Sequence, residues 1–496
     1  MKALRLVVGL ILLTAASQLS FAQQAVATPS STSSDESHVQ NPPLPADAPS
    51  DTENGTASSS SSMNLVQDPD EASANSTLED TIDAEESSEP PRRSLVRWNQ
   101  YQGPYFTARV GGGLLLEVAG FAQDHNSKQQ IGMHPDQRLR DFRFVLGGKL
   151  FPNLERKLTW SAGIMYDGPN HQWLIRQTGL MVALPELWGH FFIGRTKEGF
   201  SLNKVMVGYD GWTMERATIS DATIPILADG IKWLGYSPKH KFLWNAGYFN
   251  DVFSKGQSFS TYSSQVATRF VLLPILSDEE NKVLHLGVNF RFGKPLDNKI
   301  KFRSRPEAFP APYFVDTGSF PSDSTRMLGY EAYYRPNRWL FGSEYWWVHV
   351  SSTAQHDPLV HGGDVVATYL FNDATRVYNT VGGYFRGVSP RRSVFEGGPG
   401  AWEAVLRFSY IDLNSQTVRG GAFARITPMV NWHLSNNVRL EMAYGYGRLN
   451  RFDLKGNTQF FQSRISKFFI YFIIVEGRGK NGTERGRGRR QCEPAN

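Results

Sequence analysis

Short segments of alternating apolar and polar residues fill most of the chain from residue 94 onward. In one of them Phe142, Phe144 and Leu146 alternate with Arg143 and Val145. Because successive side chains of a strand point to opposite faces, each such segment predicts a strand with one apolar and one polar face. The same pattern recurs at residues 157–167, 284–292, 402–410 and 438–446.

Clusters of Pro, Asn, Asp and Gly separate these segments, and aromatic residues such as Trp339, Trp347 and Tyr446 lie near their ends. Repeated alternation with aromatic ends is typical of a transmembrane β-barrel. About 375 residues, at roughly two dozen for each strand and its connection, predict about sixteen antiparallel strands. A soluble β-sandwich would also alternate, but the one-sided cations and the many segments weigh against it. We therefore predict an all-β fold, a transmembrane barrel over residues 94–469.

The chain begins like a secretory signal peptide. Lys2 and Arg5 precede an apolar stretch that is followed by small residues before Gln23. We expect residues 1–22 to be removed on export, although a short uncleaved anchor is the alternative. Since no later stretch reaches the roughly 20 apolar residues of a transmembrane helix, membrane insertion must use strands.

The segments on either side of the predicted barrel differ from it in composition. Residues 23–93 hold fourteen acidic residues and are rich in Ser and Pro, so we expect a disordered acidic linker, either a tether to a wall component or a spacer. Residues 460–465 resemble a closing strand. A basic, Gly-rich tail, residues 470–496, follows as a functional extension or as the product of a frameshift or readthrough.

Charge and cysteine content restrict the function. The formal net charge is +5, and residues 94–475 contain 42 basic and 30 acidic residues, so this part of the chain is about +12. It has no nucleic-acid-binding motif, which makes nucleic acid a poor candidate partner. Cys492 is the one cysteine, so a disulfide framework and cysteine metal sites are excluded, and we expect no metal and no cofactor.

Enzymatic chemistry has little support. A nucleophile or activated water would need a His and a carboxylate beside it. The one local grouping is His349, His356, Asp357 and His361, around a Ser- and Thr-containing loop. We expect loop surface there and no catalytic residues, with a metal site from His356 and His361 as an unsupported alternative.

The stretch 299–305 places a basic residue at every second position. As a strand, it would direct Lys299, Lys301, Arg303 and Arg305 to the lumen, while Phe302 would face lipid. Such a row attracts anions and supplies donors that replace their hydration. In the alternative, Arg303 and Arg305 pair with wall acids such as Glu307, Glu331 or Glu344. The same parity makes Arg143, Lys149, Lys232, Arg269, Arg291, Arg407 and Arg439 second candidates for the lumen.

Several motifs together resemble the phosphate-selective porin O and P family of Gram-negative outer membranes. They occur in the family's order and lie at residues 194–202, 214–216, 303–308, 311–318, 397–403, 431–432 and 437–440. Gly199 stands where the family usually has proline, and Arg195-Thr196 replaces a more usual Gln-Phe, which affects the expected local loop geometry.

The resemblance implies a sixteen-stranded porin, usually a homotrimer, with an infolded loop that narrows the pore. It implies that Arg195, Lys197 and Arg216 contact anions, although Glu215 and Arg216 could instead form an ion pair that fixes a loop. The expected partners are outer-membrane lipid, small inorganic anions such as phosphate, and the barrel assembly machinery. A general porin without phosphate preference is the alternative function.

Overall fold

A computed structural model describes residues 99–154, 156–167, 172–225, 227–251, 262–277, 280–372 and 374–468. The expectations for the signal peptide, the linker and the tail fall on residues outside these ranges. Within the described part, no helix is long and apolar enough to cross a membrane.

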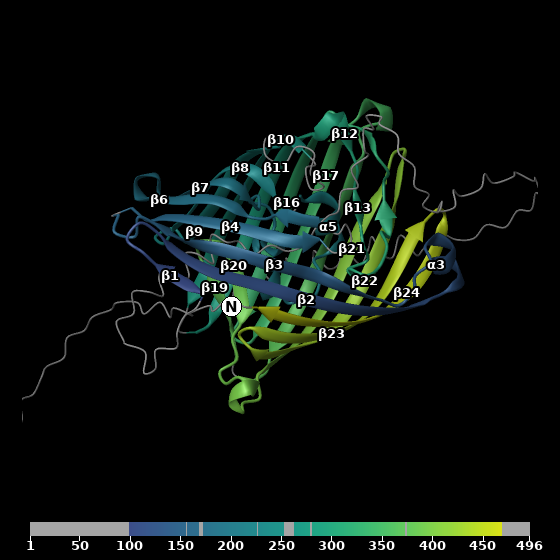
Figure 1. The fold of residues 1–496 in the computed structure, drawn as a ribbon. Coiled ribbons are helices and arrows are strands. Elements are labelled where there is room, and N and C mark those ends of the chain that lie inside the picture. The colour runs from purple at the N-terminus through teal and green to yellow at the C-terminus, as the bar shows by residue number, and fades with distance from the viewer. Residues whose placement is uncertain are drawn as a thin grey trace, which may run out of the picture.

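The protein is a closed antiparallel barrel of sixteen strands, as the alternation predicts (Figure 1). Strand β2 pairs with β24 from Gly113↔Phe468 to Gln123↔Thr458, which closes the sheet without a free edge. Figure 1 shows this closure where the purple β2 lies beside the yellow β24. The strands are β2 (Thr107–Gln123), β3 (Asp136–Leu150), β4 (Leu158–Asp167), β6 (Thr178–Leu184), β7 (Gly189–Thr196), β8 (Ala228–Ser237), β9 (Phe242–Asn250), β10 (Tyr262–Ser277), β11 (Lys282–Pro295), β16 (Ser324–Pro336), β17 (Trp339–Ser351), β18 (Leu359–Leu370), β21 (Ala401–Ser415), β22 (Val418–Ser435), β23 (Val438–Arg451) and β24 (Leu454–Phe468).

The two faces of the wall follow the alternation. In β3, Phe144 and Leu146 are exposed on the outside, while Arg143 between Phe142 and Phe144 is buried inside. An apolar outer face suits lipid, and a polar inner face suits a lumen. Of the second candidates, all but the half-buried Lys149 are buried on the inner side: Arg143, Lys232, Arg269, Arg291, Arg407 and Arg439.

Several short strands, helices and turns lie between or beside the sixteen barrel strands. Strand β1 (Gln100–Gln102) pairs with β2, and β5 (Gln172–Ile175) pairs with β4. The helix α3 (His125–Gln130) lies between β2 and β3, and its N-cap Asp124 accepts a hydrogen bond from the Ser127 amide. The 3-10 turns are η2 (Pro185–Leu187), η4 (Leu296–Asn298), η5 (Thr353–Gln355) and η6 (Val394–Glu396).

Two long connections on one side of the barrel fold into its lumen. The first, residues 197–227, follows β7 and carries α4 (Leu202–Val205), η3 (Gly208–Asp210) and α5 (Thr218–Thr223). The second, residues 296–323, follows β11 and carries the two-residue strands β12 (Lys299–Ile300), β13 (Arg303–Ser304), β14 (Val315–Asp316) and β15 (Phe320–Pro321). We call these connections segment A and segment B.

A third connection enters from the opposite end. Residues 371–400, here segment C, join β18 to β21 and carry the hairpin β19 (Arg376–Asn379) and β20 (Tyr384–Val388). Segment C begins at the end where β16 meets β17 in a two-residue turn, whereas segments A and B begin at the other end. Barrels of this type have short turns on the periplasmic side, so segment C enters from that side.

The basic row at residues 299–305 is not a barrel strand, which corrects the sequence prediction. Residues 299–300 pair with β15 and residues 303–304 pair with β14, both within segment B. Ile300 and Phe302 are buried in an apolar cluster inside the barrel together with Phe200, Phe314 and Trp346. The assignment of Phe302 to the lipid face is therefore wrong. Alternation at this length suits a short internal hairpin as well as a membrane strand.

Candidate functional site

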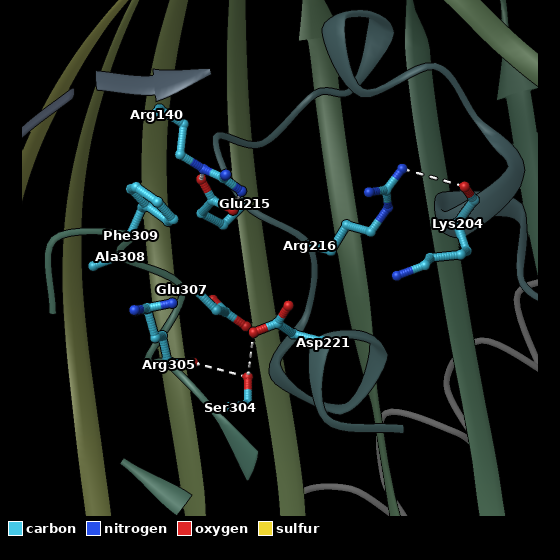
Figure 2. A pocket seen from close by; sticks show the side chains of 10 residues that line it. All are labelled: Arg140, Lys204, Glu215, Arg216, Asp221, Ser304, Arg305, Glu307, Ala308 and Phe309. Carbon is cyan, nitrogen blue, oxygen red and sulfur yellow. Dashed lines mark hydrogen bonds and ion pairs between the residues drawn. The ribbon is translucent and has the colours of Figure 1, made fainter. Parts of the chain in front are cut away.

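Segments A and B meet inside the barrel around a space that we call the chamber (Figure 2). Counted as space for the centres of water-sized molecules, its volume is about 20 Å³, so the chamber is narrow. The lining is mainly charged, with residues from strand β3 and from both segments. The lining residues are Arg140, Lys204, Glu215, Arg216, Asp221, Ser304, Arg305, Glu307, Ala308 and Phe309.

Three cations of the chamber are held by backbone carbonyl groups. Lys204 Nζ donates to the Ile224 carbonyl at 3.1 Å, and Arg305 Nε donates to the Ala311 carbonyl at 2.9 Å. Arg216 donates to the carbonyls of Asn203, Lys204 and Met206. A carbonyl oxygen is neutral, so these bonds position the three side chains and add no counter-charge of their own. The carboxylates of Asp221 and Glu344 act on Arg216 electrostatically.

Aromatic rings support the Arg305 guanidinium. The guanidinium carbon Cζ of Arg305 lies 5.1 Å from the centre of the Phe309 ring and 4.6 Å from the centre of the Tyr313 ring. Such cation–π contacts orient a guanidinium at a modest gain in free energy, and they leave its in-plane N–H groups available for oxyanions. The guanidinium carbon of Arg303 lies 4.1 Å from the centre of the same Tyr313 ring.

Two of the three carboxylates in the chamber are paired with arginines. Glu215 accepts two hydrogen bonds from Arg140, both at 2.7 Å, and also pairs with Arg464 of the wall. Glu307 pairs with Arg407 and accepts hydrogen bonds from the Thr218 amide and hydroxyl. These two acids therefore neutralise wall arginines and fix segments A and B to the barrel. The printed partners of Glu215 are thus Arg140 and Arg464.

Asp221 has a different partner. It lies on α5 and accepts a hydrogen bond from the Ser304 hydroxyl of β13 at 3.2 Å. This bond joins segment A to segment B, and Figure 2 shows the two side chains pointing toward each other. Lys204 and Arg305 lie close enough to act on it electrostatically.

The surroundings change the acidity of three chamber groups on segment A. Burial by itself raises the pKa of Glu215, but Arg140 and Arg464 outweigh it and lower the pKa to about 2. Burial raises the pKa of Asp221, and the nearby Lys204 and Arg305 offset only part of this. Burial lowers the pKa of Arg216 to about 10, so this guanidinium stays charged near neutral pH.

Of the eight residues that the sequence proposed as anion contacts, the structure brings Arg216 and Arg305 together in the chamber. Lys299 is exposed at one end of segment B, and Lys301 lies 3.5 Å from Asp316 in an ion pair. Arg291 pairs with Glu198 and Arg195 pairs with Asp229, while Lys197 donates to the Met206 carbonyl. None of these last three lines the chamber: Arg195 and Arg291 lie in wall strands, and Lys197 lies at the start of segment A.

Three wall arginines and Arg376 of segment C anchor segment A. Arg376 donates to the carbonyl of Asp210, Arg407 to that of Glu215 and Arg439 to that of Gly211. Arg464 likewise donates to the Met214 carbonyl. The alternation of the sequence correctly predicted that Arg407 and Arg439 lie on the inner face of the barrel. Their bonds show that they hold an infolded segment.

The acids proposed as partners of Arg303 and Arg305 bind other groups. Glu307 pairs with Arg407 and Glu331 pairs with Arg269, while Glu344 accepts hydrogen bonds from the Ser201 hydroxyl and the Asn203 amide. Lys204, Arg140 and Asp221 were missed as chamber residues. Lys204 and Asp221 lie in connections without a strong alternating pattern, so strand parity gave no signal for them.

Two residues of the histidine grouping are held by neighbouring residues. His361 Nδ1 is 2.6 Å from the Tyr345 hydroxyl, and Asp357 accepts a hydrogen bond from the Ser352 amide. Among the residues that the structure describes, no three His, Cys, Asp or Glu side chains are placed to hold a metal ion.

Comparison with known sequences gives a family. The family model of phosphate-selective porin O and P matches residues 110–455. A curated protein of Caulobacter vibrioides, described as uncharacterized, is 27% identical over 166 residues, which are 33% of this chain and 33% of that protein. The chain thus spans about one third of the length of this relative.

Solved structures with a similar chain path include three outer membrane proteins. OmpT of Vibrio cholerae is 11% identical, with a TM-score of 0.48 over 74% of this chain and 99% of that one. An anion-selective porin from Comamonas acidovorans is 12% identical, with a TM-score of 0.46 over 73% of this chain and 100% of that one. The outer membrane channel DcaP of Acinetobacter baumannii is 10% identical, with a TM-score of 0.45 over 74% of this chain and 98% of that one. These scores lie below 0.5, so family membership rests on the family model.

Proposed function

Because the chain belongs to the phosphate-selective porin O and P family, we propose that it forms a channel for small anions and binds a phosphate-type oxyanion in the chamber. The chain lies in the outer membrane. One observation carries the proposal. Lys204, Arg216 and Arg305 converge on a single space inside the barrel, and neutral carbonyl oxygens hold them there.

The chemistry of the three cations suits a transient oxyanion site. A unit charge pair at about 4 Å is worth roughly 4 kcal/mol at an effective dielectric of 20, before desolvation is subtracted. Arginine adds planar donors that match two oxygens of one anion, and lysine adds a compact third charge. Several donors of this kind replace the hydration of the anion, and the open chamber lets it leave again.

A titration of the chloride current with phosphate tests this proposal. In planar bilayers, phosphate should reduce the chloride current through the native channel. Replacing both Lys204→Gln and Arg305→Gln should raise the half-blocking phosphate concentration at least about tenfold, which corresponds to about 1.4 kcal/mol. The control Lys239→Gln removes one charge from the exposed turn between β8 and β9 and should leave the block unchanged.

A chloride current that phosphate leaves unchanged would contradict the binding site. If the native channel prefers chloride over potassium but phosphate does not block it, the protein is a general anion porin. That second function is supported by the family and by the positive charge of the barrel. It does not require a binding site in the chamber.

Assembly and processing follow as further parts of the proposal. Strands β6 and β7 have 7 and 8 residues, fewer than the roughly 9–11 that a membrane-spanning strand needs. In a homotrimer, two other copies of the chain would pack against the short strands β6 and β7 and would cover this part of the wall. We further propose that residues 1–22 are cleaved on export, that residues 23–93 form a periplasmic linker, and that the assembly machinery recognises β24.

A further inference from the structure

Two basic side chains stand on the outer face of the barrel, at the end where segment B begins and ends. Lys294 of β11 and Arg326 of β16 are both exposed. Among the residues that the structure describes, neither side chain has a hydrogen bond or an ion pair. Arginines of the inner face differ, since Arg291 of the same strand β11 pairs with Glu198. The two outer cations are therefore available to a group outside the protein.

The strand register brings these cations together. Phe292 lies opposite Arg326, and Lys294 follows Phe292 on the same face, so Lys294 and Arg326 are diagonal neighbours. Diagonal neighbours of an antiparallel pair lie about 7–8 Å apart, within reach of one anion for long side chains. The half-buried His349 of β17 lies directly opposite Arg326 on its other side. Figure 1 shows β11, β16 and β17 side by side. We call Lys294, Arg326 and His349 the outer patch.

The depth of the outer patch matches the headgroups of the outer leaflet. Strand β11 carries outward lysines at both ends, Lys282 and Lys294, and the residues between them, 283–293, have the length of roughly 9–11 residues that a membrane-spanning strand needs. Phe292 and Trp347 are exposed on the same face, next to the patch on its membrane side. Aromatic residues of this kind mark the level of the headgroups. A cation costs little there, in contrast to the bilayer midplane.

We propose that the outer patch binds a phosphate group on the headgroup of an outer-leaflet lipid. Lys294 and Arg326 supply the charge, and an imidazole N–H of His349 supplies a further donor. The acyl chains lie along the exposed Phe292 and Leu328, just below the cations. This apolar surface favours a lipid phosphate over a free one, because it offers the lipid a second contact. The inference goes beyond transport and does not depend on the chamber.

The outer patch also lies away from the strands proposed to pack in the homotrimer. Strands β8, β9 and β10 separate β11 from β7 along the closed sheet. The outward faces of β11, β16 and β17 are thus left to lipid. A lipid bound there would join β11 to β16, the two strands that segment B connects.

Two lipids that differ in phosphate content test the proposal on the native protein. The full chain, purified in detergent, is titrated with bisphosphorylated lipid A and with the same lipid after removal of both phosphates, and native mass spectrometry measures the bound fraction. The phosphorylated lipid should half-saturate the protein at a concentration at least about tenfold lower. This comparison needs no variant, so a folding defect in a variant does not affect it.

Matched variants then assign the binding to the outer patch. Combining Lys294→Gln with Arg326→Gln should raise the half-saturating concentration of bisphosphorylated lipid A at least about tenfold, because basic residues near the surface attract anionic lipids. The control combines Lys239→Gln with Lys282→Gln, which removes the same charge from the periplasmic end of the wall and should leave binding unchanged. Phosphate block of the chloride current should persist in both variants, since none of these residues lines the chamber.

Several results would overturn the proposal. Equal half-saturating concentrations of the two lipids on the native protein would show that phosphate is not recognised. Unchanged binding by the Lys294 and Arg326 variant would place the lipid elsewhere. Displacement of the lipid by an equal concentration of inorganic phosphate would indicate a site for free anions, and a changed oligomeric state of that variant would indicate a contact between copies. A native channel that phosphate does not block would contradict the chamber site alone.

Discussion

The buried carboxylate of Glu331 in the barrel wall has several partners. Glu331 accepts hydrogen bonds from Arg269 and Asn289 and is 2.7 Å from His285 Nε2, and all of these groups are buried. Arg269 in turn donates to the Gly383 carbonyl of segment C. One carboxylate thus connects three wall strands and an infolded segment.

Removing Glu331 should therefore destabilise the folded barrel strongly. Glu331→Ala leaves the Arg269 guanidinium buried without its counter-charge, and such a loss costs about 3–5 kcal/mol. Urea unfolding in lipid vesicles measures the change. The control Glu186→Ala breaks an exposed pair with Arg156 and should cost no more than about 1 kcal/mol. Equal effects of the two variants would mean that the Glu331 network contributes little to stability.

Barrel strands and infolded hairpins share one sequence pattern, and this limits what alternation can predict. The strands at residues 142–150 and 284–292 were predicted correctly because their apolar faces are long and lipid-facing. The row at 299–305 alternates equally well but is interrupted beyond Arg305 by Pro306, Pro310 and Pro312, which cannot donate to a strand ladder. That signal favours a connection over a spanning strand.

The chamber itself was only partly predictable. Arg305 was found through the alternation of the basic row and Arg216 through the resemblance to the family, whereas Asp221 and Ser304 meet across 83 positions of sequence. Parity along one strand cannot show which residues of two separate connections will touch. The meeting of segments A and B depends on the apolar cluster that contains Phe302 and Phe314.

A pair of substitutions separates the lipid face from the internal cluster. Phe144→Arg places a charge on the exposed outer face of β3 and should cost about 2–4 kcal/mol if the site lies near the bilayer midplane. The heat-modifiable, folded fraction in outer membranes should fall. Phe302→Ala should leave the folded barrel largely intact, because Phe302 packs in the apolar cluster inside the barrel and not against lipid, but it should loosen the chamber and weaken phosphate block. The reverse pattern would restore Phe302 to the lipid face.

The whole lumen is narrowed from both ends. Arg376 of segment C donates to the Asp210 carbonyl of segment A at 2.6 Å. A Cβ atom added to Gly387 of segment C would lie 3.7 Å from the Asp210 Cα. Segments that begin at opposite ends of the barrel therefore touch inside it, and the path for a solute must pass beside this contact.

A designed disulfide tests that arrangement. In a chain with Cys492→Ser, the substitutions Asp210→Cys and Gly387→Cys should allow a bond to form on mild oxidation, since Cβ atoms of bonded cysteines lie about 3.5–4.5 Å apart. A mobility shift on gels without reductant reports the bond. A control with cysteines at Asp210 and Lys239, in an exposed turn, should not form it. Failure of the first pair to cross-link in folded protein would place segment C outside the lumen.

The central claim is that the cations of segments A and B make the channel anion-selective. The reversal potential of the native channel in a planar bilayer under a potassium chloride gradient tests it most directly. We predict the sign of an anion-selective pore, and we predict a smaller or inverted potential when Lys204→Glu and Arg305→Glu are combined, since screening is incomplete over a Debye length of about 8 Å. A native reversal potential with the sign of a cation-selective pore would contradict the account.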